Sequence, residues 1–475
     1  MSYTQQQAMM VSVAEAREIA RFDEDQHQDE LDRWYESGKS LTAGAKGDLM
    51  RKPDEGEEDW QQRVARMATV NVLARIVDAV ADWIYHESPK RSLSLAQDGE
   101  SKADEILQDQ MRRMRMRIAE RDRGAGQVLR GKAWDCYGWR ARRGPGDPGS
   151  ITVRSVRRKD VYAEYNPTDP SRPTLLVHRF AHDGAKGLAT SHQYVMWTDT
   201  TYASYDDNGA PLPLGDLAPS GTNPFGLIPF SESRGITVPG TDRCISLVRD
   251  VVAQQRLVLN KLSDLDQLVR YQSGDVMVLK DFASDEKKTV GASRFIRLNP
   301  DPNTDLFFAS PAAKITEALE VIKQHVEWCF QSCGLPVTVL TGEQTESGYA
   351  LAVRYQQAIS LVKKYQERGA VGEEHALRVM CAVGRYGGLA LPEPWSFNPI
   401  VQFSDQIFPA DRDAERLADA QDVEAGRMTL KDYLRRHRKD ITEERLDAYV
   451  AELQAEQAAK PKPADPFGFG GAPPL

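Results

Sequence analysis

The sequence lacks any long apolar run. Its hydrophobic stretches are broken by charged residues within a few positions, whereas a membrane-spanning helix needs about 20 consecutive apolar residues. The first residues, Met1 to Gln6, have neither the basic start nor the apolar core of a signal peptide. These absences predict a soluble protein, made in a cytoplasm, with no membrane partner.

Cysteine is scarce as well. The 475 residues include only five, Cys136, Cys244, Cys329, Cys333 and Cys381, and they suggest no disulfide framework. Such usage is typical of a reducing compartment. The 41% hydrophobic and 28% charged content is that of a soluble chain long enough for two or three domains.

Common catalytic motifs are also missing. There is no glycine-rich loop followed by Lys-Ser or Lys-Thr, and no dinucleotide fingerprint, which argues against ATP hydrolysis by this chain alone. We therefore predict a protein that is not an enzyme, with no catalytic residue, no cofactor and no metal.

Two patterns leave a metal-based alternative open. His325, Cys329 and Cys333 lie four residues apart, although two of them fit a packing stripe and no fourth zinc ligand is in place. Asp23 to Glu30 with His27, and Asp411 with Asp413 and Glu415, are acidic clusters of the kind that hold divalent cations, or are solvated helix surface.

Charge is distributed unevenly. Residues 1 to 60 carry a balance of −8 out of the net −9, whereas residues 111 to 143 contain eleven Lys or Arg against three acids. This basic segment either meets phosphates or forms a solvated face with salt bridges to an acidic neighbour. Two interpretations are also open for Tyr349 and Tyr355: their rings either stack on bases or pack in a core.

The most informative segment lies between Pro239 and Gly348. An apolar stripe from Val248 to Val269 predicts a long amphipathic helix from Thr241 to Arg270, about 45 Å long at about 1.5 Å per residue. A second helix is predicted from the N-cap Ser310 to the C-cap Gly334. Its stripe alternates four and three residues, which is typical of two helices that lie side by side: Ile315, Leu319, Ile322, Val326, Cys329 and Cys333.

A small strand module is predicted between these two helices. Val276 to Leu279, Phe295 to Leu298 and Leu306 to Phe308 are short apolar runs separated by turn-forming residues. Three short strands bury little core by themselves, so the module indicates completion by a neighbouring copy of the chain.

Elsewhere the patterns are simpler. Helices are predicted over 4 to 37 and 64 to 85, and an antiparallel β region over 133 to 206. After the loop of residues 334 to 348, a helix with a bend at Gly369 and Gly372 is expected. Helical signals return from 411 to 453, and the Pro- and Gly-rich end predicts a disordered tail.

Four stretches together resemble the portal proteins of tailed bacteriophages: Arg33 to Lys39, Asn71 to Asp82, Asn223 to Phe230 and Gly334 to Gly348. Each match is short, and their order along the chain carries the resemblance. It implies an α+β, mainly helical subunit with a wing, a two-helix stem, a small clip, a tunnel loop and a helical crown.

The resemblance also implies a division of the chain. The helical part of the wing would cover 1 to 110 and its β-rich part 111 to 238. The remaining parts would be the first stem helix at 239–270, the clip at 271–310, the second stem helix at 311–334, the tunnel loop at 335–348, a bent helix at 349–390, the crown at 391–459 and the tail at 460–475.

The implied function is that of a ring, usually of twelve subunits, at one capsid vertex of the virion. Double-stranded DNA would pass through it during packaging and ejection. Its partners would be the terminase large subunit, the major capsid or scaffolding protein and head-tail adaptor proteins, with assembly in the host cytoplasm. The alternatives are a metal-dependent nucleic-acid-processing enzyme and a capsid adaptor ring without DNA passage.

Two sets of residues acquire roles from this resemblance. The loop has no Lys or Arg from Val337 to Glu346, so DNA would slide past it without tight phosphate contacts. Its candidate channel residues are Val339, Leu340, Thr341, Glu343, Gln344 and Glu346. The candidate partner-binding residues of the clip are Lys280, Lys287, Lys288, Arg294 and Arg297. They either bind an acidic partner or are simply solvated.

Overall fold

A computed structural model provides the structure of the chain. It describes residues 23–37, 48–53, 55–67, 69–94, 100–142, 144, 147, 149–166, 168–182, 191–206, 208–215, 217–241, 243–272, 276–280, 305–309, 315–337, 348–404, 419–423, 425–437 and 449–451. The chain divides into a unit of residues 1–345 with 352–407, and a second unit of residues 346–351 with 408–475.

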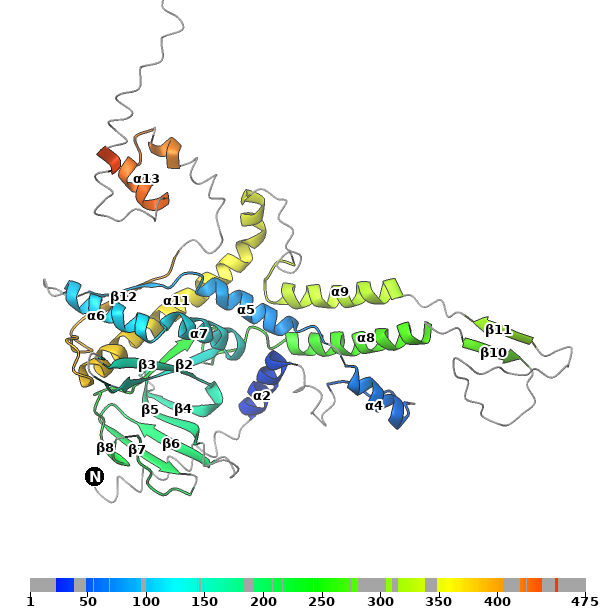
Figure 1. Ribbon diagram of the computed structural model, residues 1–475, viewed down its shortest axis with the longest axis horizontal. Helices are drawn as coiled ribbons and strands as arrows, with labels where there is room; N and C mark the ends of the chain where they lie inside the picture. Colours follow the sequence, from blue (N-terminus) through cyan, green and yellow to red (C-terminus); the bar gives the residue numbers. More distant parts are fainter. Residues whose placement is uncertain are drawn as a thin grey trace, which may run out of the picture. The chain divides into compact units, whose positions relative to one another are not determined.

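The first unit mixes helices and sheets, as the sequence predicts (Figure 1). Among the described residues, no helix combines the length and apolarity needed to span a bilayer. The helices on the N-terminal side of the sheets are α2 (Asp23–Glu36), α4 (Glu57–Ala65), α5 (Val72–Ile84), α6 (Glu100–Arg113) and α7 (Met116–Arg130).

The helix predicted over residues 64 to 85 starts too early, because two helices meet this range: α4 ends at Ala65 and α5 begins at Val72. Asn71 begins the second, because its Oδ1 accepts a hydrogen bond from Ala74 N at 3.0 Å and so satisfies a donor of the first turn. The apolar sequence of α5 predicts a core helix, and seven of its residues are buried. Helix continues through α7 to Arg130, so the β-rich part begins at Lys132 and not at residue 111.

Two antiparallel sheets follow. The three-stranded sheet has the order β3-β2-β9, formed by β2 (Lys132–Arg140), β3 (Ser150–Val156) and β9 (Phe230–Arg234). The five-stranded sheet runs in sequence order. Its strands are β4 (Val161–Asn166), β5 (Asp169–His182), β6 (Ser191–Trp197), β7 (Thr201–Asp206) and β8 (Ser220–Thr222). The predicted antiparallel region is confirmed.

The core has two main parts. One is an apolar cluster shared by the two sheets, with Trp134 and Phe230 from the smaller sheet and Val195 and Trp197 from the larger. The other lies between the smaller sheet and the helices, where Tyr137 and Ile151 pack with Leu377 and Met380 of α11 (Gly348–Tyr386). The long helix α11 is therefore built into the core on the helical side.

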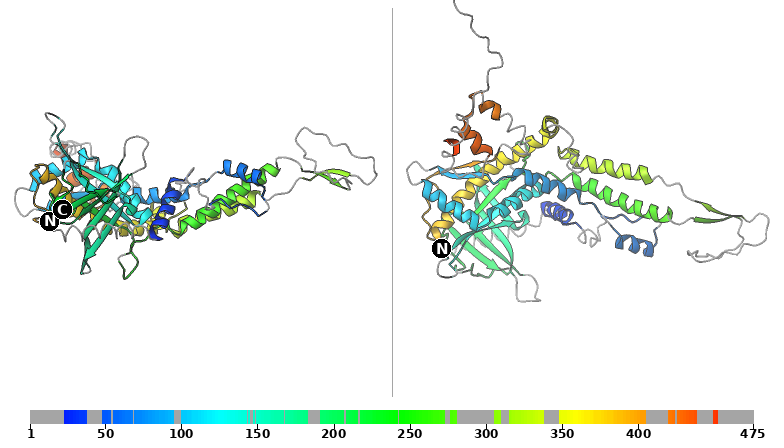
Figure 2. Two further views of the ribbon diagram at one scale, coloured as in Figure 1. Left: turned by 90° about the horizontal axis from the view of Figure 1, so that it is seen from below. Right: turned by 45° about the horizontal axis from the view of Figure 1, so that its top comes forward.

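The two predicted long helices pack against each other. They are α8 (Val251–Gln272) and α9 (Ile315–Ser332), which we call the stem (Figures 1 and 2). In the chain they are connected through β10 (Val276–Lys280) and β11 (Asp305–Ala309), which pair antiparallel. The second helix ends as predicted, with Gly334 at φ 71° and Leu335 N bonded to Phe330 O at 3.0 Å.

The first stem helix begins at Val251, so the predicted starts at residues 239 and 241 are wrong. The backbone of that segment is used elsewhere: Val238 N bonds to Arg243 O, and Ile245 N bonds to Ile236 O, both at 2.9 Å. Leu247 N then bonds to Val128 O of α7 at 3.0 Å. The first two bonds close a local turn, and the third ties the segment to α7. The helix of 22 residues that follows is about 33 Å long.

Helix α11 is a single element of 39 residues through both Gly369 and Gly372, where the sequence suggests an interruption. Gly372 serves close packing, because an added Cβ would lie 2.5 Å from Glu232 O of β9. The glycine lets the helix approach the sheet, so its role is in packing against a strand.

Part of the predicted crown belongs to the first unit. Strand β12 (Asn398–Gln402) pairs with β1 (Lys90–Ser94) in a two-stranded antiparallel sheet that the sequence analysis does not anticipate. Leu391 and Phe397 are buried in the helical core cluster. Residues 391 to 402 are therefore tied to the core, and the second unit contains α13 (Leu430–His437) among its described residues.

Several expectations fall on residues outside the described ranges. These are the first part of the helix predicted over 4 to 37, the strand Phe295 to Leu298, the N-cap at Ser310, most of the helical signals of 411 to 453, and the predicted tail.

Candidate functional site

The stem has a polar and thiol-lined seam. His325 Nδ1 lies 3.0 Å from Gln254 Oε1, and Cys333 Sγ donates to Leu247 O at 3.7 Å. Burial raises the pKa of Cys329 to about 11 and of Cys333 to about 12, so both thiols stay protonated at neutral pH. Among the described residues, no group of three His, Cys, Asp or Glu is arranged to hold a metal.

The outer surface of the stem is unusually apolar. Leu257 and Leu268 of α8 lie eleven residues apart and so share one face, and Val321 and Trp328 of α9 share another. Leu257 is 41% exposed and Trp328 is 50% exposed. Leu319, which belongs to the predicted packing stripe, is also 49% exposed. Large apolar side chains gathered on exposed helix faces mark interaction surfaces.

The base of the stem is fixed to α5. The side chain of Gln255 is fully buried, and its Oε1 accepts from Leu73 N at 2.7 Å. Leu73 N belongs to the first turn of α5, where backbone donors have no partner within the helix. Val251, Val258 and Leu259 are buried around this contact. Gln255 Nε2 also donates to Asn71 Oδ1 at 3.4 Å, so the stem joins the core through an apolar contact with hydrogen bonds of Gln255 to the start of α5.

A buried ionic cluster of five residues joins four elements next to this core. Its members are Arg91 of β1, Glu120 and Arg123 of α7, Asp135 of β2 and Glu373 of α11, and we call it the ionic hub. Each of the five is less than a tenth exposed. The hub contains two guanidiniums and three carboxylates in the centre of the first unit.

Arg123 is the most connected member of the hub. Its Nε lies 2.5 Å from Asp135 Oδ2, its Nη1 pairs with Glu373, and its Nη2 donates to Tyr137 Oη at 3.3 Å. Arg91 Nη1 lies 2.7 Å from Glu120, and its Nη2 lies 2.9 Å from Glu373. Burial raises the pKa of Glu373, but attraction to Arg123 and Arg91 exceeds that effect and leaves the pKa below its ordinary value.

The basic segment of residues 111 to 143 is largely neutralised within the chain. Arg113 pairs with Asp109 at 2.5 Å, Arg121 with Asp82 at 2.7 Å and Arg130 with Asp32 at 2.8 Å. Arg123 belongs to the ionic hub, and Lys132 pairs with Glu232 at 2.9 Å. Of the two interpretations of this segment, salt bridges to acidic neighbours are the one these contacts bear out.

The acidic N-terminal segment supplies several of those neighbours. Asp29 pairs with Lys159, Glu30 with Arg256 at 2.6 Å and Asp32 with Arg130. Asp29 and Glu30 therefore have cationic partners in this structure, whereas the second acidic cluster, Asp411 to Glu415, lies outside the described residues. Tyr355 packs edge-on against Trp83 of α5 with ring centroids 6.1 Å apart, which is a packing role.

Two histidines make stability depend on pH. Burial, followed by the charge of Arg154, lowers the pKa of His178 to about 4, and burial with Arg172 and Arg378 does the same for His375. Both values lie below the value near 6.5 of an unfolded chain, so the unfolded state takes up protons first as the pH falls. Their stabilising effect is complete above pH ~6.5 and is lost as the pH falls toward ~4.

We expect His178 alone to account for a loss of roughly 2 kcal/mol between about pH 7 and pH 5. Denaturant unfolding at several pH values measures this, and His178→Gln should reduce the dependence by about that amount. Equal pH dependence of the variant and the original chain would contradict the assignment.

Most of the sequence-predicted site residues lie outside the described ranges. That applies to the loop residues Val339, Leu340, Thr341, Glu343, Gln344 and Glu346, and to Lys287, Lys288, Arg294 and Arg297. Lys280 lies in β10, in register with Asp305 of β11. The structure places the two ends of the loop, at Val337 after α9 and at Gly348 at the start of α11.

The ionic hub is the main feature that sequence reasoning missed. One signal for it existed: Glu373 is a carboxylate just before the segment Ala376 to Val383, which is apolar except for Arg378, in a helix that builds the core. Its partners, Arg91 and Arg123, lie about 280 and 250 residues away in the chain. A single sequence gives no means of pairing them.

Comparison with known proteins yields little at the sequence level. No family model and no curated protein matches the chain. Among solved structures, a chain from the virion of a native gene transfer agent particle is similar at 11% sequence identity, with 81% of this chain and 94% of that chain covered. The TM-score of 0.40 does not establish a common fold.

Proposed function

We propose that this chain is the subunit of a portal-type ring that forms a channel for double-stranded DNA at a capsid vertex. The observation that carries the proposal is the stem: two long helices packed side by side, connected in the chain through an antiparallel pair of strands, with large apolar side chains exposed along both. The resemblance of four sequence stretches to portal proteins agrees with it.

The exposed stem residues support assembly through neighbouring copies. A closed ring uses two different surfaces of each subunit, one for the neighbour on either side. Leu257 and Leu268 on α8 and Val321 and Trp328 on α9 provide apolar contacts on both helices of the stem. In this proposal, the stem of each copy packs between the stems of its two neighbours.

The sequence of the loop between α9 and α11 supports a channel lining. Val337 to Glu346 contains no Lys or Arg and includes Glu343 and Glu346. A wall of this composition makes no salt-dependent contacts with phosphates, so it exerts little electrostatic drag on a moving duplex. The clip cations, Lys280 among them, would contact the acidic surface of a packaging motor or of an adaptor protein.

The loop is tested by reversing its charge. Glu343→Lys with Glu346→Lys should reduce the amount of DNA packaged, because each lysine adds about one phosphate contact per subunit. Raising the salt concentration should partly restore packaging, since such contacts weaken with a slope near −0.9 per contact. A packaging assay with nuclease-protected DNA as its readout measures both effects.

The matched control is Glu343→Gln with Glu346→Gln, which removes the negative charge without adding positive charge. It should package DNA nearly as well as the original chain. If the lysine variant forms rings of normal appearance and packages as much DNA as the original chain, the loop does not line the channel.

A further inference from the structure

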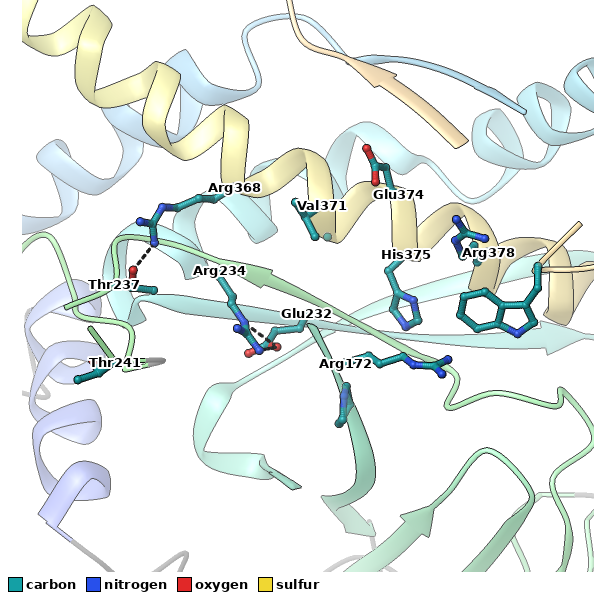
Figure 3. A pocket seen from close by; sticks show the side chains of 13 residues that line it. Arg172, Glu232, Arg234, Thr237, Thr241, Arg368, Val371, Glu374, His375 and Arg378 are labelled. Carbon is teal, nitrogen blue, oxygen red and sulfur yellow. Dashed lines mark hydrogen bonds and ion pairs between the residues drawn. The ribbon is translucent and has the colours of Figure 1, made fainter. Parts of the chain in front are cut away.

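A cleft of about 610 Å³ lies between α11 and the strands β5 and β9 (Figure 3). Arg368, His375 and Arg378 come from α11, Arg172 from β5, and Glu232 and Arg234 from β9. Figure 3 shows His375 pointing from the helix toward Arg172 on the opposite wall. A cleft of this size matches the range of ligand-binding pockets, about 300–1,000 Å³.

Three of the four arginines in the cleft have no carboxylate partner among the described residues. Arg234 lies 3.0 Å from Glu232, which also pairs with Lys132. Arg172, Arg368 and Arg378 have no such ion pair within the described part of the chain. The lining contains four arginines and two glutamates, Glu232 and Glu374, so its positive charges outnumber its negative ones. The cleft is therefore suited to binding an anion.

The three arginines that have no described ion pair are positioned by contacts with uncharged groups. Arg378 Nη1 donates to Pro394 O at 2.9 Å and to Phe397 O at 3.2 Å. Arg368 Nη1 donates to Gly235 O at 3.0 Å and to Thr237 Oγ1 at 2.6 Å. Arg172 and Arg378 also lie over the ring of Trp395, 4.7 and 4.9 Å from its centroid. Such fixed arginines lose little entropy when they bind a carboxylate.

The pKa of His375 reflects the positive charge of the cleft. Its pKa is lowered to about 4 by burial and then by the nearby charges of Arg172 and Arg378. The imidazole is therefore neutral at pH 7 and adds no charge to the wall. The imidazole has a hydrogen bond to the backbone of Phe230, so at most one ring nitrogen is left as a polar contact for a ligand.

The composition of the wall favours a peptide over nucleic acid. Glu374 and Glu232 are carboxylates in the lining, and they repel an anion more strongly the more charge it carries. A peptide with a few spaced carboxylates is therefore tolerated better than a continuous polyphosphate chain. Trp395 and Val371, which are 53% and 59% exposed, provide apolar contacts beside the guanidiniums. Charged and apolar contacts in alternation suit a segment in which acidic side chains alternate with apolar ones, and Trp and Arg dominate such interfaces.

We infer that this cleft binds an acidic peptide segment of a partner protein, with its carboxylates on Arg172 and Arg378 and an apolar side chain against Trp395. The inference does not depend on the proposed channel function, because the cleft is formed within one copy of the chain. It adds to the molecule a docking site for a partner recognised by negative charge.

Fluorescence anisotropy with the full chain tests the inference. The probe is a short fluorescein-labelled peptide of alternating glutamate and leucine, which should bind saturably. A peptide with glutamine in place of glutamate should bind at least about tenfold more weakly, because hydrogen bonds to charged groups contribute about 1.5–3 kcal/mol. Arg172→Gln should weaken binding of the acidic peptide by about tenfold as well. The matched control, Arg112→Gln, changes an exposed arginine on α6 outside the cleft and should leave binding unchanged.

Arg172 makes no hydrogen bond or ion pair among the described residues, so Arg172→Gln should fold normally. Trp395→Leu provides a second variant of the same wall. Saturable peptide binding that both variants weaken supports the inference. Peptide binding that neither variant changes, or no saturable binding, overturns it. Labelled double-stranded DNA that binds more tightly than the peptide and depends on Arg172 also overturns it in favour of a nucleic-acid site.

Discussion

Replacing Arg123 by methionine is expected to destabilise the folded chain by about 3–5 kcal/mol, the cost of removing one partner from a buried ion pair. Arg123 is 1% exposed and is the cation that contacts both Asp135 and Glu373. Without it, Arg91 is the only cation left in the ionic hub for three carboxylates. Denaturant unfolding of the variant and the original chain measures the difference.

The hub also predicts an order among variants. Glu373→Gln removes the carboxylate that both arginines share, yet it leaves Arg91 with Glu120 and Arg123 with Asp135. The hub then contains two cations and two anions, so we expect a smaller loss than for Arg123→Met. Glu367→Ala, an exposed position on the same helix, is the control and should change stability by less than about 0.5 kcal/mol. A larger loss for Glu373→Gln than for Arg123→Met would contradict this account of the hub.

Replacing Trp328 by glutamate is expected to abolish assembly while the chain stays folded. The side chain is half exposed and contacts His325 of its own helix, with ring centroids 5.1 Å apart, so its loss leaves no cavity in the core. Tryptophan at the centre of an interface commonly contributes 2 kcal/mol or more, which is about 30-fold in affinity for each contact between neighbours. Size-exclusion chromatography with light scattering measures the state of assembly.

Ile118→Glu is the matched control for the stem variant. Ile118 is 56% exposed, and it lies on α7 away from the stem. This variant should assemble like the original chain. If Trp328→Glu assembles normally, the exposed face of α9 is not an interface between copies, and if both variants fail to assemble, the effect is not specific to the stem.

The sequence predicts best those elements whose signals are local. The stem helix α9, its glycine end at Gly334 and the antiparallel β region all follow from periodicity and turn residues. The start of α8 does not, because the backbone bonds of Arg243 and Ile245 close a local turn, and Leu247 N bonds to Val128 O of α7, which overrides the helical pattern before Val251. The pairing of β1 with β12 joins residues that are about 300 apart in the chain. In neither strand do apolar and polar residues alternate clearly enough to predict a strand.

The same distinction applies to the candidate sites. The basic segment is visible in the sequence, but its charges are matched by Asp32, Asp82 and Glu373, which only the fold brings near. The arginine cleft is the opposite case: its four arginines are scattered from Arg172 to Arg378, so no local run of charge marks the site. Sequence reasoning finds runs of charge, whereas folding decides which charges remain unpaired.

Assembly of the full chain into a closed ring is the central claim, and native mass spectrometry tests it most directly. We expect one dominant species containing twelve copies of the 53.2 kDa chain, with a central hole in negative-stain images of the same sample. A chain that stays at the mass of a single copy at every concentration would contradict the account.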